Sequence, residues 1–239
     1  LVRNETTFDP SRFDSAKLRR QYGVPEKAKV VMFFGTPRVH KGIGKVAQAV
    51  AQINDDNFLF VVVGTSPDKR VTSELERLSN GRLLNIPNQP FSSIPEILSM
   101  ADLVCLPQDV THETSKYQLP AKAMDAIAMC KPLLVSNTVP LKQLVDDDVA
   151  ELIDEHDLAS QIYSVANRKP SAEKLKKRKE KFLSNYSYKS AESTLREIFR
   201  SVLNKKGNID ITEQEIFWES LRNAFVPKVR SNSLSGIDV

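Results

Sequence analysis

Cysteine, histidine and long apolar runs are scarce in this sequence of 239 residues, and each scarcity argues against a class of protein. The two cysteines, Cys105 and Cys130, and the three histidines lack the short spacings of a zinc site, so we expect no metal and reduced thiols, as in a cytoplasmic protein. No apolar run approaches the roughly 20 residues of a membrane-spanning helix. Aromatic residues make up only 7% of the chain and are not interleaved with the basic ones, which argues against nucleic-acid binding.

Glycine-rich phosphate loops are also missing. The chain has eight glycines and no G-K-[ST] sequence after a glycine-rich run, so ATP hydrolysis at a P-loop is not expected. We interpret Gly42 and Gly44, in the sequence GIG, as lying inside a helix rather than in a phosphate-binding turn. The aspartate run at residues 146–148 is interpreted as a polar cap between a helix and a strand, not as a set of metal ligands.

Short apolar segments alternate with amphipathic ones over residues 1–170, which predicts an α/β fold. We expect strands at 29–34, 58–63, 83–86, 103–106 and 133–135, and helices at 41–53, 70–79, 94–100, 141–145 and 158–167. Strands and helices that alternate in this way form right-handed crossovers and a parallel sheet covered on both faces. The predicted core is therefore Rossmann-like.

The segment YQLPAKAMDAIAMCKPLLV, residues 117–135, combines a helix start, a lysine, a carboxylate and a following strand. Pro120 suits the first helical turn, and Lys122 and Asp125 then lie on one helix face. A phosphate at this helix N-terminus would meet backbone N–H groups, the positive end of the helix dipole and the Lys122 ammonium group. Asp125 could accept hydrogen bonds from a ribose diol. The alternative is an ordinary helix, with Lys122 and Asp125 as a surface ion pair.

A second segment, FFGTPRVHKGIGKV at residues 33–46, places a glycine and basic residues between a strand and a helix. Arg38 and Lys41 would then lie at the carboxyl edge of the sheet, where open α/β folds bind ligands. A guanidinium and an ammonium group at this edge could neutralise a diphosphate. The alternative is a solvated basic loop.

The first segment resembles the donor-binding motif of the GT-B glycosyltransferases, in particular the retaining family called glycosyltransferase group 1. That motif often reads P-x-K-x-x-E, then an apolar run, then G-K-P, and it is matched here by Pro120, Lys122, Asp125, Lys131 and Pro132. The family's K-G at a helix start is similar to Lys41 and Gly42. The opening VRNETTFDPSRFD resembles the inter-domain linker and residues 186–203 resemble the closing helix, so the resemblance covers about residues 1–203.

The resemblance implies the donor-binding, C-terminal half of a GT-B fold. Its activity would be transfer of a sugar from a nucleotide diphosphate sugar to an acceptor hydroxyl in glycan or glycoconjugate synthesis, without a metal ion. The residues expected at the donor are Arg38, Lys41, Lys122, Leu119, Pro120 and Ala121 for the diphosphate, Asp125 for the ribose, and Phe91 and Ile94 for the base. Phe91 and Ile94 could equally be core residues. No catalytic residue is assigned.

The acceptor half of such an enzyme is expected to be missing, because 239 residues are too few for two GT-B domains. The chain begins with Leu and shows no secretory leader, so we expect a fragment that binds the donor weakly and transfers nothing alone. We expect three parts: a nucleotide-sugar-binding domain at 1–170, C-terminal helices at 171–206, and an extension at 207–239 that is partly helical with a mobile tail.

The chain departs from the family pattern at several positions. Tyr117 stands where many members have a first glutamate, and Glu113 is four residues away from that position. Asp125 replaces the second glutamate, and Cys130 replaces a glycine that ends the helix, where a left-handed backbone is easiest for glycine. The usual arginine is displaced by two residues to Arg38. The retained residues favour a divergent subfamily over a decayed site.

The basic run KLKKRKEK at residues 174–181 could dock on anionic lipid headgroups, which would place the protein at the inner membrane face, or it could be a solvated helix face. Three rival functions stay open. The first is a non-catalytic nucleotide-binding or protein-interaction module, which the loss of the first glutamate permits. The second is a sugar-nucleotide epimerase, and the third is a nucleic-acid-binding domain.

Overall fold

The computed structural model describes residues 2–204. The chain divides into two compact units, Leu1–Glu192 and Ser193–Val239, and each is considered by itself. The sheet and the candidate site belong to the first unit. The boundary expected at residues 170 and 171 stays a prediction, and the extension expected at 207–239 lies outside the described residues.

Six strands form one parallel sheet: β1 Lys29–Phe34, β2 Phe58–Val63, β3 Leu83–Ile86, β4 Leu103–Leu106, β5 Leu133–Val135 and β6 Glu151–Leu152. Their order is β3-β2-β1-β4-β5-β6, as in a doubly wound α/β fold. The five predicted strands are confirmed at the predicted residues. Four of them are largely buried apolar runs, whereas β3 has only Ile86 fully buried. β6 was not predicted, since two residues are too few to show a pattern.

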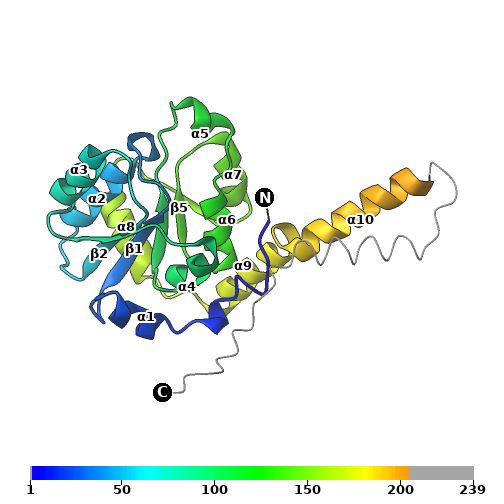
Figure 1. Ribbon diagram of the computed structural model, residues 1–239, viewed down its shortest axis with the longest axis horizontal. Coiled ribbons are helices and arrows are strands. Elements are labelled where there is room, and N and C mark those ends of the chain that lie inside the picture. Colours follow the sequence, from blue (N-terminus) through cyan, green and yellow to red (C-terminus); the bar gives the residue numbers. More distant parts are fainter. Residues whose placement is uncertain (1, 205–239) are drawn as a thin grey trace, which may run out of the picture. The chain divides into compact units, whose positions relative to one another are not determined.

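Helices cover both faces of the sheet. They are α1 Ser15–Gln21, α2 Ile43–Gln52, α3 Lys69–Ser79, α4 Ile94–Ser99, α5 Glu113–Tyr117, α6 Ala121–Ala128, α7 Val139–Asp146, α8 Leu158–Asn167, α9 Ala172–Asn185 and α10 Tyr188–Asn204. Figure 1 shows α2, α3 and α8 on one side of the sheet and α4 and α6 on the other. The predicted Rossmann-like fold is therefore confirmed, although α1 and α5 were not expected.

Polar residues fix where several helices begin. Ser171 accepts a hydrogen bond from the backbone N–H of Lys174 at 3.1 Å at the start of α9, and Asp157 accepts one from Ser160 at 3.2 Å at the start of α8. Such caps satisfy N–H groups that the first helical turn leaves unpaired, and each contributes about 1 kcal/mol. The two helices therefore start where the sequence pattern placed them.

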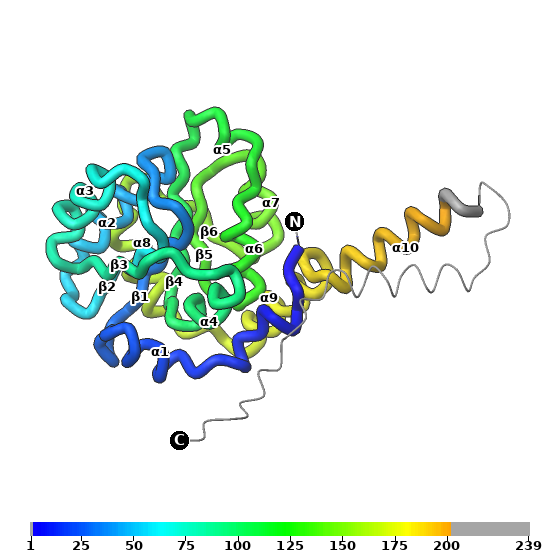
Figure 2. Tube along the Cα trace, viewed as in Figure 1, coloured from blue at the N-terminus to red at the C-terminus, as the bar shows by residue number. Residues whose placement is uncertain are grey.

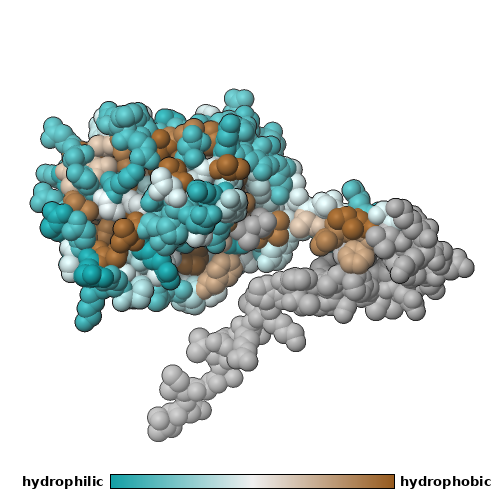
Figure 3. Space-filling view, turned by 90° about the horizontal axis from the view of Figure 1, so that it is seen from above, coloured by the Kyte–Doolittle hydropathy of each residue, from teal (hydrophilic) through white to brown (hydrophobic). Residues whose placement is uncertain are grey.

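The core is formed by the sheet and the inner faces of its helices. Strands β1, β2 and β4 are buried almost throughout, as expected of central parallel strands. The largest fully buried side chains include Phe33, Phe60, Met32 and Leu103. On the visible face of the first unit, Figure 3 shows a mainly hydrophilic surface with scattered apolar areas, which is ordinary for a globular domain.

Glycines shape the carboxyl edge of the sheet. Gly64 follows β2 with a φ of 137°, and a Cβ atom there would lie 2.6 Å from the carbonyl oxygen of Gly35, which follows β1. Gly42 precedes α2 with a φ of 65°, a left-handed conformation that favours glycine. The interpretation of Gly42 as part of a helix is therefore wrong: it is the N-cap residue, and only Gly44 lies in α2.

The N-terminal segment pairs with the junction between α9 and α10 (Figure 2). The backbone N–H of Arg3 donates to the carbonyl oxygen of Tyr186 at 2.8 Å, and that of Tyr188 donates to the carbonyl oxygen of Arg3 at 2.9 Å. Arg3 and Ser187 thus form a short parallel bridge. This bridge holds the Arg3 side chain beside α6, where the candidate site begins.

Candidate functional site

The two sequence motifs meet at the carboxyl edge of the sheet, where the strand order changes direction between β1 and β4. Open α/β folds bind their ligands at this switch point. The loop after β1 carries Arg38 and Lys41, and the backbone N–H of Asp109, after β4, donates to the carbonyl oxygen of His40 at 3.0 Å. The fold therefore brings the two loops together as the sequence predicted.

Lys41 and Lys122 are half-buried cations without a counter-charge at hydrogen-bond distance. Among the described residues, neither ammonium group has a hydrogen bond or an ion pair. Burial and the Lys41 charge lower the pKa of Lys122, while Asp125 acts to raise it; burial and the Arg38 charge lower the pKa of Lys41. Both lysines would be stabilised by an anion bound between them.

The backbone at Gly35 leaves room for the Lys122 side chain. A Cβ atom at Gly35 would lie 2.6 Å from Lys122 Nζ and 2.3 Å from its Cε. The same ammonium group lies 5.7 Å from the centre of the Phe33 ring, at cation–π distance. Gly35, which closes β1, therefore lets the Lys122 side chain of α6 reach the edge of the sheet.

The N-terminus of α6 has no side-chain cap. Pro120 is its N-cap residue and makes no side-chain hydrogen bond, as a proline must. Leu119 is half-buried, Pro120 is buried and Ala121 is exposed. The first turn therefore presents backbone N–H groups and the positive end of the dipole beside Lys122, which is the anion-binding arrangement expected from the sequence.

Asp125 lies in a different environment from the one expected. It is only 4% exposed, and its carboxylate pairs with the Arg3 guanidinium group rather than forming a surface pair with Lys122. Arg3 also donates to the carbonyl oxygen of Ala121 at 3.4 Å. Burial raises the pKa of Asp125, and Arg3 and Lys122 act to lower it. The alternative of a Lys122–Asp125 surface pair is therefore wrong.

Arg3 is the site residue that sequence reasoning missed. It lies 122 residues before Asp125, and no local pattern connects residues that far apart. The only signal was the resemblance of the opening segment to an inter-domain linker. The Arg3 guanidinium group lies 5.4 Å from the centre of the Phe91 ring and 5.9 Å from that of Phe8. Arg3 therefore joins the candidate ribose residue to the candidate base residue.

The two base candidates differ in exposure. Phe91 lies in a 3₁₀ turn before α4 and is 60% exposed, so its ring is accessible to a planar ligand. Ile94 begins α4 and packs against the hydrophobic core. The core alternative is therefore supported for Ile94.

The other residues near the two motifs are exposed or half-buried. The Arg38 side chain is exposed, at the start of a 3₁₀ turn that spans Val39–Lys41. The His40 and His112 rings stack with centres 4.2 Å apart and planes 14° apart. Burial and His112 lower the pKa of His40. Tyr117, at the position of the first family glutamate, is 79% exposed at the end of α5.

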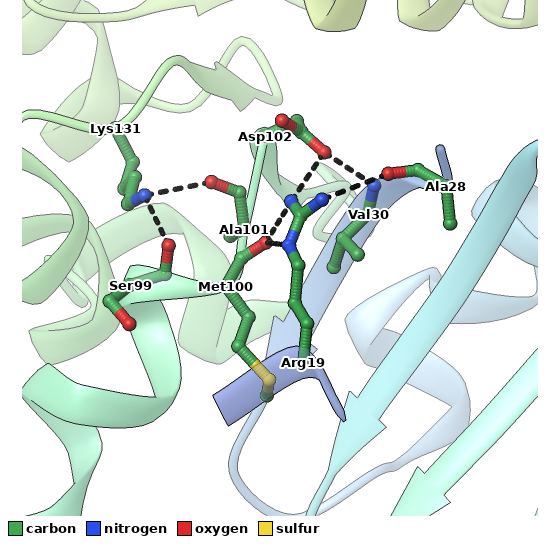
Figure 4. A network of polar contacts seen from close by, with 8 residues as sticks. All are labelled: Arg19, Ala28, Val30, Ser99, Met100, Ala101, Asp102 and Lys131. Atoms are coloured by element: carbon green, nitrogen blue, oxygen red, sulfur yellow. Dashed lines mark hydrogen bonds and ion pairs between the residues drawn. The ribbon is translucent and has the colours of Figure 1, made fainter. Parts of the chain in front are cut away.

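The last two residues of the first motif lie at the opposite edge of the sheet. Lys131 Nζ donates to the carbonyl oxygens of Ser99 and Ala101 at 2.8 and 2.9 Å (Figure 4). Pro132 directly precedes β5. Lys131 therefore holds the end of α4 against the sheet, and its match to the motif reflects packing rather than contact with a donor.

Cys130 has the left-handed backbone that the family glycine would adopt, with a φ of 55°. Its N–H donates to the carbonyl oxygen of Ile127, and the N–H of Lys131 donates to that of Ala126, both at 2.9 Å. These two bonds form a Schellman motif that ends α6. The substitution of cysteine for glycine therefore leaves the shape of the turn intact.

The basic run at 174–181 is largely paired with acidic groups of its own domain. Lys177 and Lys181 of α9 contact Asp148 and Asp147 at 2.9 and 2.8 Å. The other ion pairs of the run are Lys174 with Glu151, Lys176 with Glu180 and Lys179 with Asp9. The aspartates after α7 thus act as partners of α9, and the run lies along the domain surface.

Two properties of the described residues bear on metals and membranes. None of their histidines, cysteines and acidic residues gather in threes close enough to hold a metal ion. Nor does any described helix have the length and apolarity needed to cross a bilayer.

Comparisons with known proteins agree with the fold and the motifs. The sequence profile of the family described as "Glycosyl transferases group 1" matches residues 14–182. Escherichia coli (strain K12) WcaI, a glycosyl transferase by name, is 27% identical over 93 residues, which cover 37% of this chain and 22% of that protein.

Solved structures show the same fold at low identity. Anabaena Alr3699/HepE, crystallised with UDP-glucose, is 17% identical with a TM-score of 0.66 over 83% of this chain and 55% of its own. The C-terminal domain of the group 1 protein LpcC from Francisella tularensis is 15% identical with a TM-score of 0.62 over 77% of this chain and 98% of its own. The match thus spans about half of the HepE chain and almost all of the LpcC domain. With its sheet order, its two motifs and a family match over most of its length, this chain belongs to the glycosyl transferases of group 1.

Proposed function

We propose that this chain is the donor-binding half of a glycosyltransferase that transfers a sugar from a nucleotide diphosphate sugar to an acceptor hydroxyl in glycan or glycoconjugate synthesis. The observation that carries the proposal is the pair of half-buried lysines, Lys41 and Lys122, which have no ion pair within the described part of the chain and lie beside the uncapped N-terminus of α6. HepE, which shares the fold, was crystallised with UDP-glucose and with UDP. A nucleoside diphosphate supplies the negative charge that this edge lacks.

The same groups give a reason for catalysis without a metal ion. When the bond between the sugar and the diphosphate breaks, negative charge develops on the departing phosphate oxygen. Lys41 and Lys122 and the dipole of α6 are positioned in advance to stabilise that charge, and exposed Arg38 can add its guanidinium group. In this proposal, the preorganised lysine side chains take the role that a bound metal ion has in other transferases.

Asp125 and Arg3 are proposed to hold the ribose. A carboxylate can accept both hydroxyls of a ribose diol, and the pairing with Arg3 favours the ionised form of Asp125 that this requires. The exposed ring of Phe91 lies 5.4 Å from the Arg3 guanidinium group and can stack on a base. The nucleoside would thus take the space around Arg3.

Partners and location follow from the same proposal. A second domain must bind the acceptor, since the chain spans about half of HepE. Two free thiols, Cys105 and Cys130, fit a cytoplasmic protein. Contact of α9 with an anionic membrane remains a proposal with few unpaired cations to support it, because most of its basic run is in ion pairs.

Calorimetric titration with UDP, GDP, dTDP and ADP in the presence of a chelator tests the donor site. We expect one nucleotide to bind best, and Lys41→Ala or Lys122→Ala to weaken its binding by about tenfold to a hundredfold, because each removes a charge-assisted hydrogen bond. Lys45→Ala, an exposed lysine of α2, is the matched control and should change little. Binding that survives both site variants would contradict the proposal.

A non-catalytic nucleotide-binding or interaction module is the second candidate. The exposed Tyr117 at the position of the first family glutamate favours it. In that case Asp125→Ala would leave sugar transfer by the complete protein unchanged, whereas the donor proposal expects a loss. A transfer assay on the complete protein separates the two candidates.

A further inference from the structure

An open groove of about 610 Å³ lies at the amino edge of the sheet, the edge opposite Lys41 and Lys122. Its walls come from the start of β1, the turn between α6 and β5, the end of α8 and the first half of α9. The volume is in the range of small-molecule sites. Nothing in the donor proposal uses this groove.

Positive charge dominates the lining of the groove. Its cationic residues are Lys29, Lys131, Arg168, Lys169, Lys176 and Lys179, and its carboxylates are Asp9 and Asp102. Asp102 is already engaged by Arg19 at 2.8 Å and by the backbone N–H of Val30 at 2.7 Å. Asp9 lies 3.9 Å from Lys179. Arg168 is paired with Glu151 at 2.7 Å and Lys176 with Glu180 at 3.8 Å. The lining cations without an ion pair among the described residues are therefore Lys29, Lys131 and Lys169.

Helix dipoles explain only part of this charge. Cations near helix C-termini are stabilised by the last carbonyl groups, and the amino edge of a parallel sheet collects such ends. Figure 4 shows this arrangement for Lys131 and Arg19, which donate to the carbonyl oxygens at the end of α4. Lys29 and Lys169 have no hydrogen bond or ion pair among the described residues. These two lysines are free to bind an anion.

A buried arginine adds charge behind the groove. Arg178 of α9 is 6% exposed, and no described residue accepts a hydrogen bond from its Nε or Nη1. It faces a cavity of about 10 Å³, about the size of one water molecule, that shares Pro132, Arg168 and Pro170 with the groove. Burial lowers the pKa of Arg178, and Glu151, which lines the same small cavity, acts to raise it. Arg178 therefore lies behind the groove and is not one of its lining residues.

Part of the groove lining is apolar. The apolar lining residues are Ala101, Met129, Pro132, Ala166, Pro170 and Leu175. Lysine ammonium groups bind phosphate as point charges, and apolar lining residues favour a ligand with carbon–hydrogen surface. The fitting ligand therefore has an anionic head and an apolar body.

We propose that this groove is a second anion-binding site, independent of the donor edge, for a ligand that carries a phosphate group on an apolar body. The phosphate contacts Lys29, Lys169 and Lys176, with Lys176 turning from Glu180 to the phosphate, and the body lies against the apolar lining residues. A soluble phosphate ester and the headgroup of a phospholipid share this chemistry. The experiment must distinguish these two sources.

The test uses the Lys41→Ala/Lys122→Ala double variant, so that the donor edge does not contribute. Hexyl phosphate is titrated by calorimetry, with inorganic phosphate for comparison, and flotation is measured with phosphatidylcholine vesicles with and without phosphatidic acid. We expect hexyl phosphate to bind more tightly than inorganic phosphate. Adding Lys169→Ala and Lys176→Ala should weaken that binding about tenfold or more, because two charged contacts are lost.

The matched control adds Lys69→Ala and Lys142→Ala, which remove the same charge from exposed positions on α3 and α7. Binding of hexyl phosphate without flotation supports the soluble source, and groove-dependent flotation supports the lipid source. Equal losses in the groove and control variants would overturn the proposal, since the attraction would then be diffuse. Absence of binding to either probe, in variants whose thermal unfolding is unchanged, would overturn it as well.

Discussion

Cys130 shows how a single residue can keep a turn while adding strain to it. A non-glycine residue in the left-handed region costs about 1 kcal/mol relative to glycine, and Cys130 occupies that region at the end of α6. We therefore expect Cys130→Gly to raise the free energy of unfolding by up to about 1 kcal/mol, measured by urea denaturation. Cys130→Ala removes the same thiol without relieving the backbone, so it should give no gain. A gain in the alanine variant would contradict the role of the backbone.

Lys131 gives the stability of the domain a specific pH dependence. Burial lowers its pKa from 10.5 to about 8, with Arg19 adding to the effect and Asp102 and Cys130 opposing it. Between these two values the unfolded chain binds more protons than the folded one, so stability rises with pH. We expect the free energy of unfolding of the wild type, relative to Lys131→Met, to rise by up to about 3 kcal/mol across this interval. Urea denaturation of both proteins over a pH series measures it, and a flat or falling difference would contradict the prediction.

At the scale of single residues, the sequence predicted site residues that local spacing places together. It missed a contact between residues that are far apart in the chain and meet only on folding. Lys122 beside the N-terminus of α6 followed from helical spacing, and the approach of Lys41 followed from the rule for sheet edges. Arg3 could not be predicted as the partner of Asp125, since only tertiary packing connects them. Lys131 matches the motif although it lies away from the candidate site, because its ammonium group holds the end of α4.

At the scale of elements, the loop between β1 and α2 depends on Gly42. A Cβ atom at this position would lie 1.8 Å from the carbonyl oxygen of Pro107, besides requiring a left-handed backbone. We expect Gly42→Ala to destabilise the domain by more than about 2 kcal/mol and to weaken donor binding by displacing Lys41. Thermal unfolding and calorimetry measure the two effects.

Gly23 provides the control for that substitution. Its φ of 68° is almost the same, but nothing lies within 4 Å of the position of a Cβ atom. Gly23→Ala should therefore cost only the backbone strain, about 1 kcal/mol, and leave donor binding unchanged. Equal losses of stability in the two variants would show that contact with Pro107 does not matter.

Elements were predicted where burial imposed a pattern. β1 and β2 are apolar runs closed by glycines, so their residues were read correctly from the sequence. β6 and α5 are two and five residues long, which is too short for any periodicity to appear. Helix α1 was missed because only Leu18 is buried in it.

At the scale of the whole molecule, the described residues contain a six-stranded parallel sheet, and the chain spans about half of its structural relative HepE. We expect it to bind a nucleoside diphosphate and to show no sugar transfer alone, because the proposed function assigns acceptor binding to a second domain. A transfer assay with radiolabelled nucleotide sugar and a mixture of acceptors checks this. Turnover by this chain alone would show that the acceptor site lies within it.

The bridge between Arg3 and Ser187 brings the two ends of the sheet-forming segment together, because all the strands lie between these residues in the sequence. Circular permutation is tolerated where termini lie close together. Joining residue 187 to residue 3 through a short linker and opening the chain in the turn at residues 54–57 would therefore keep every strand pair. The order of the strands in space would then be independent of where the polypeptide starts.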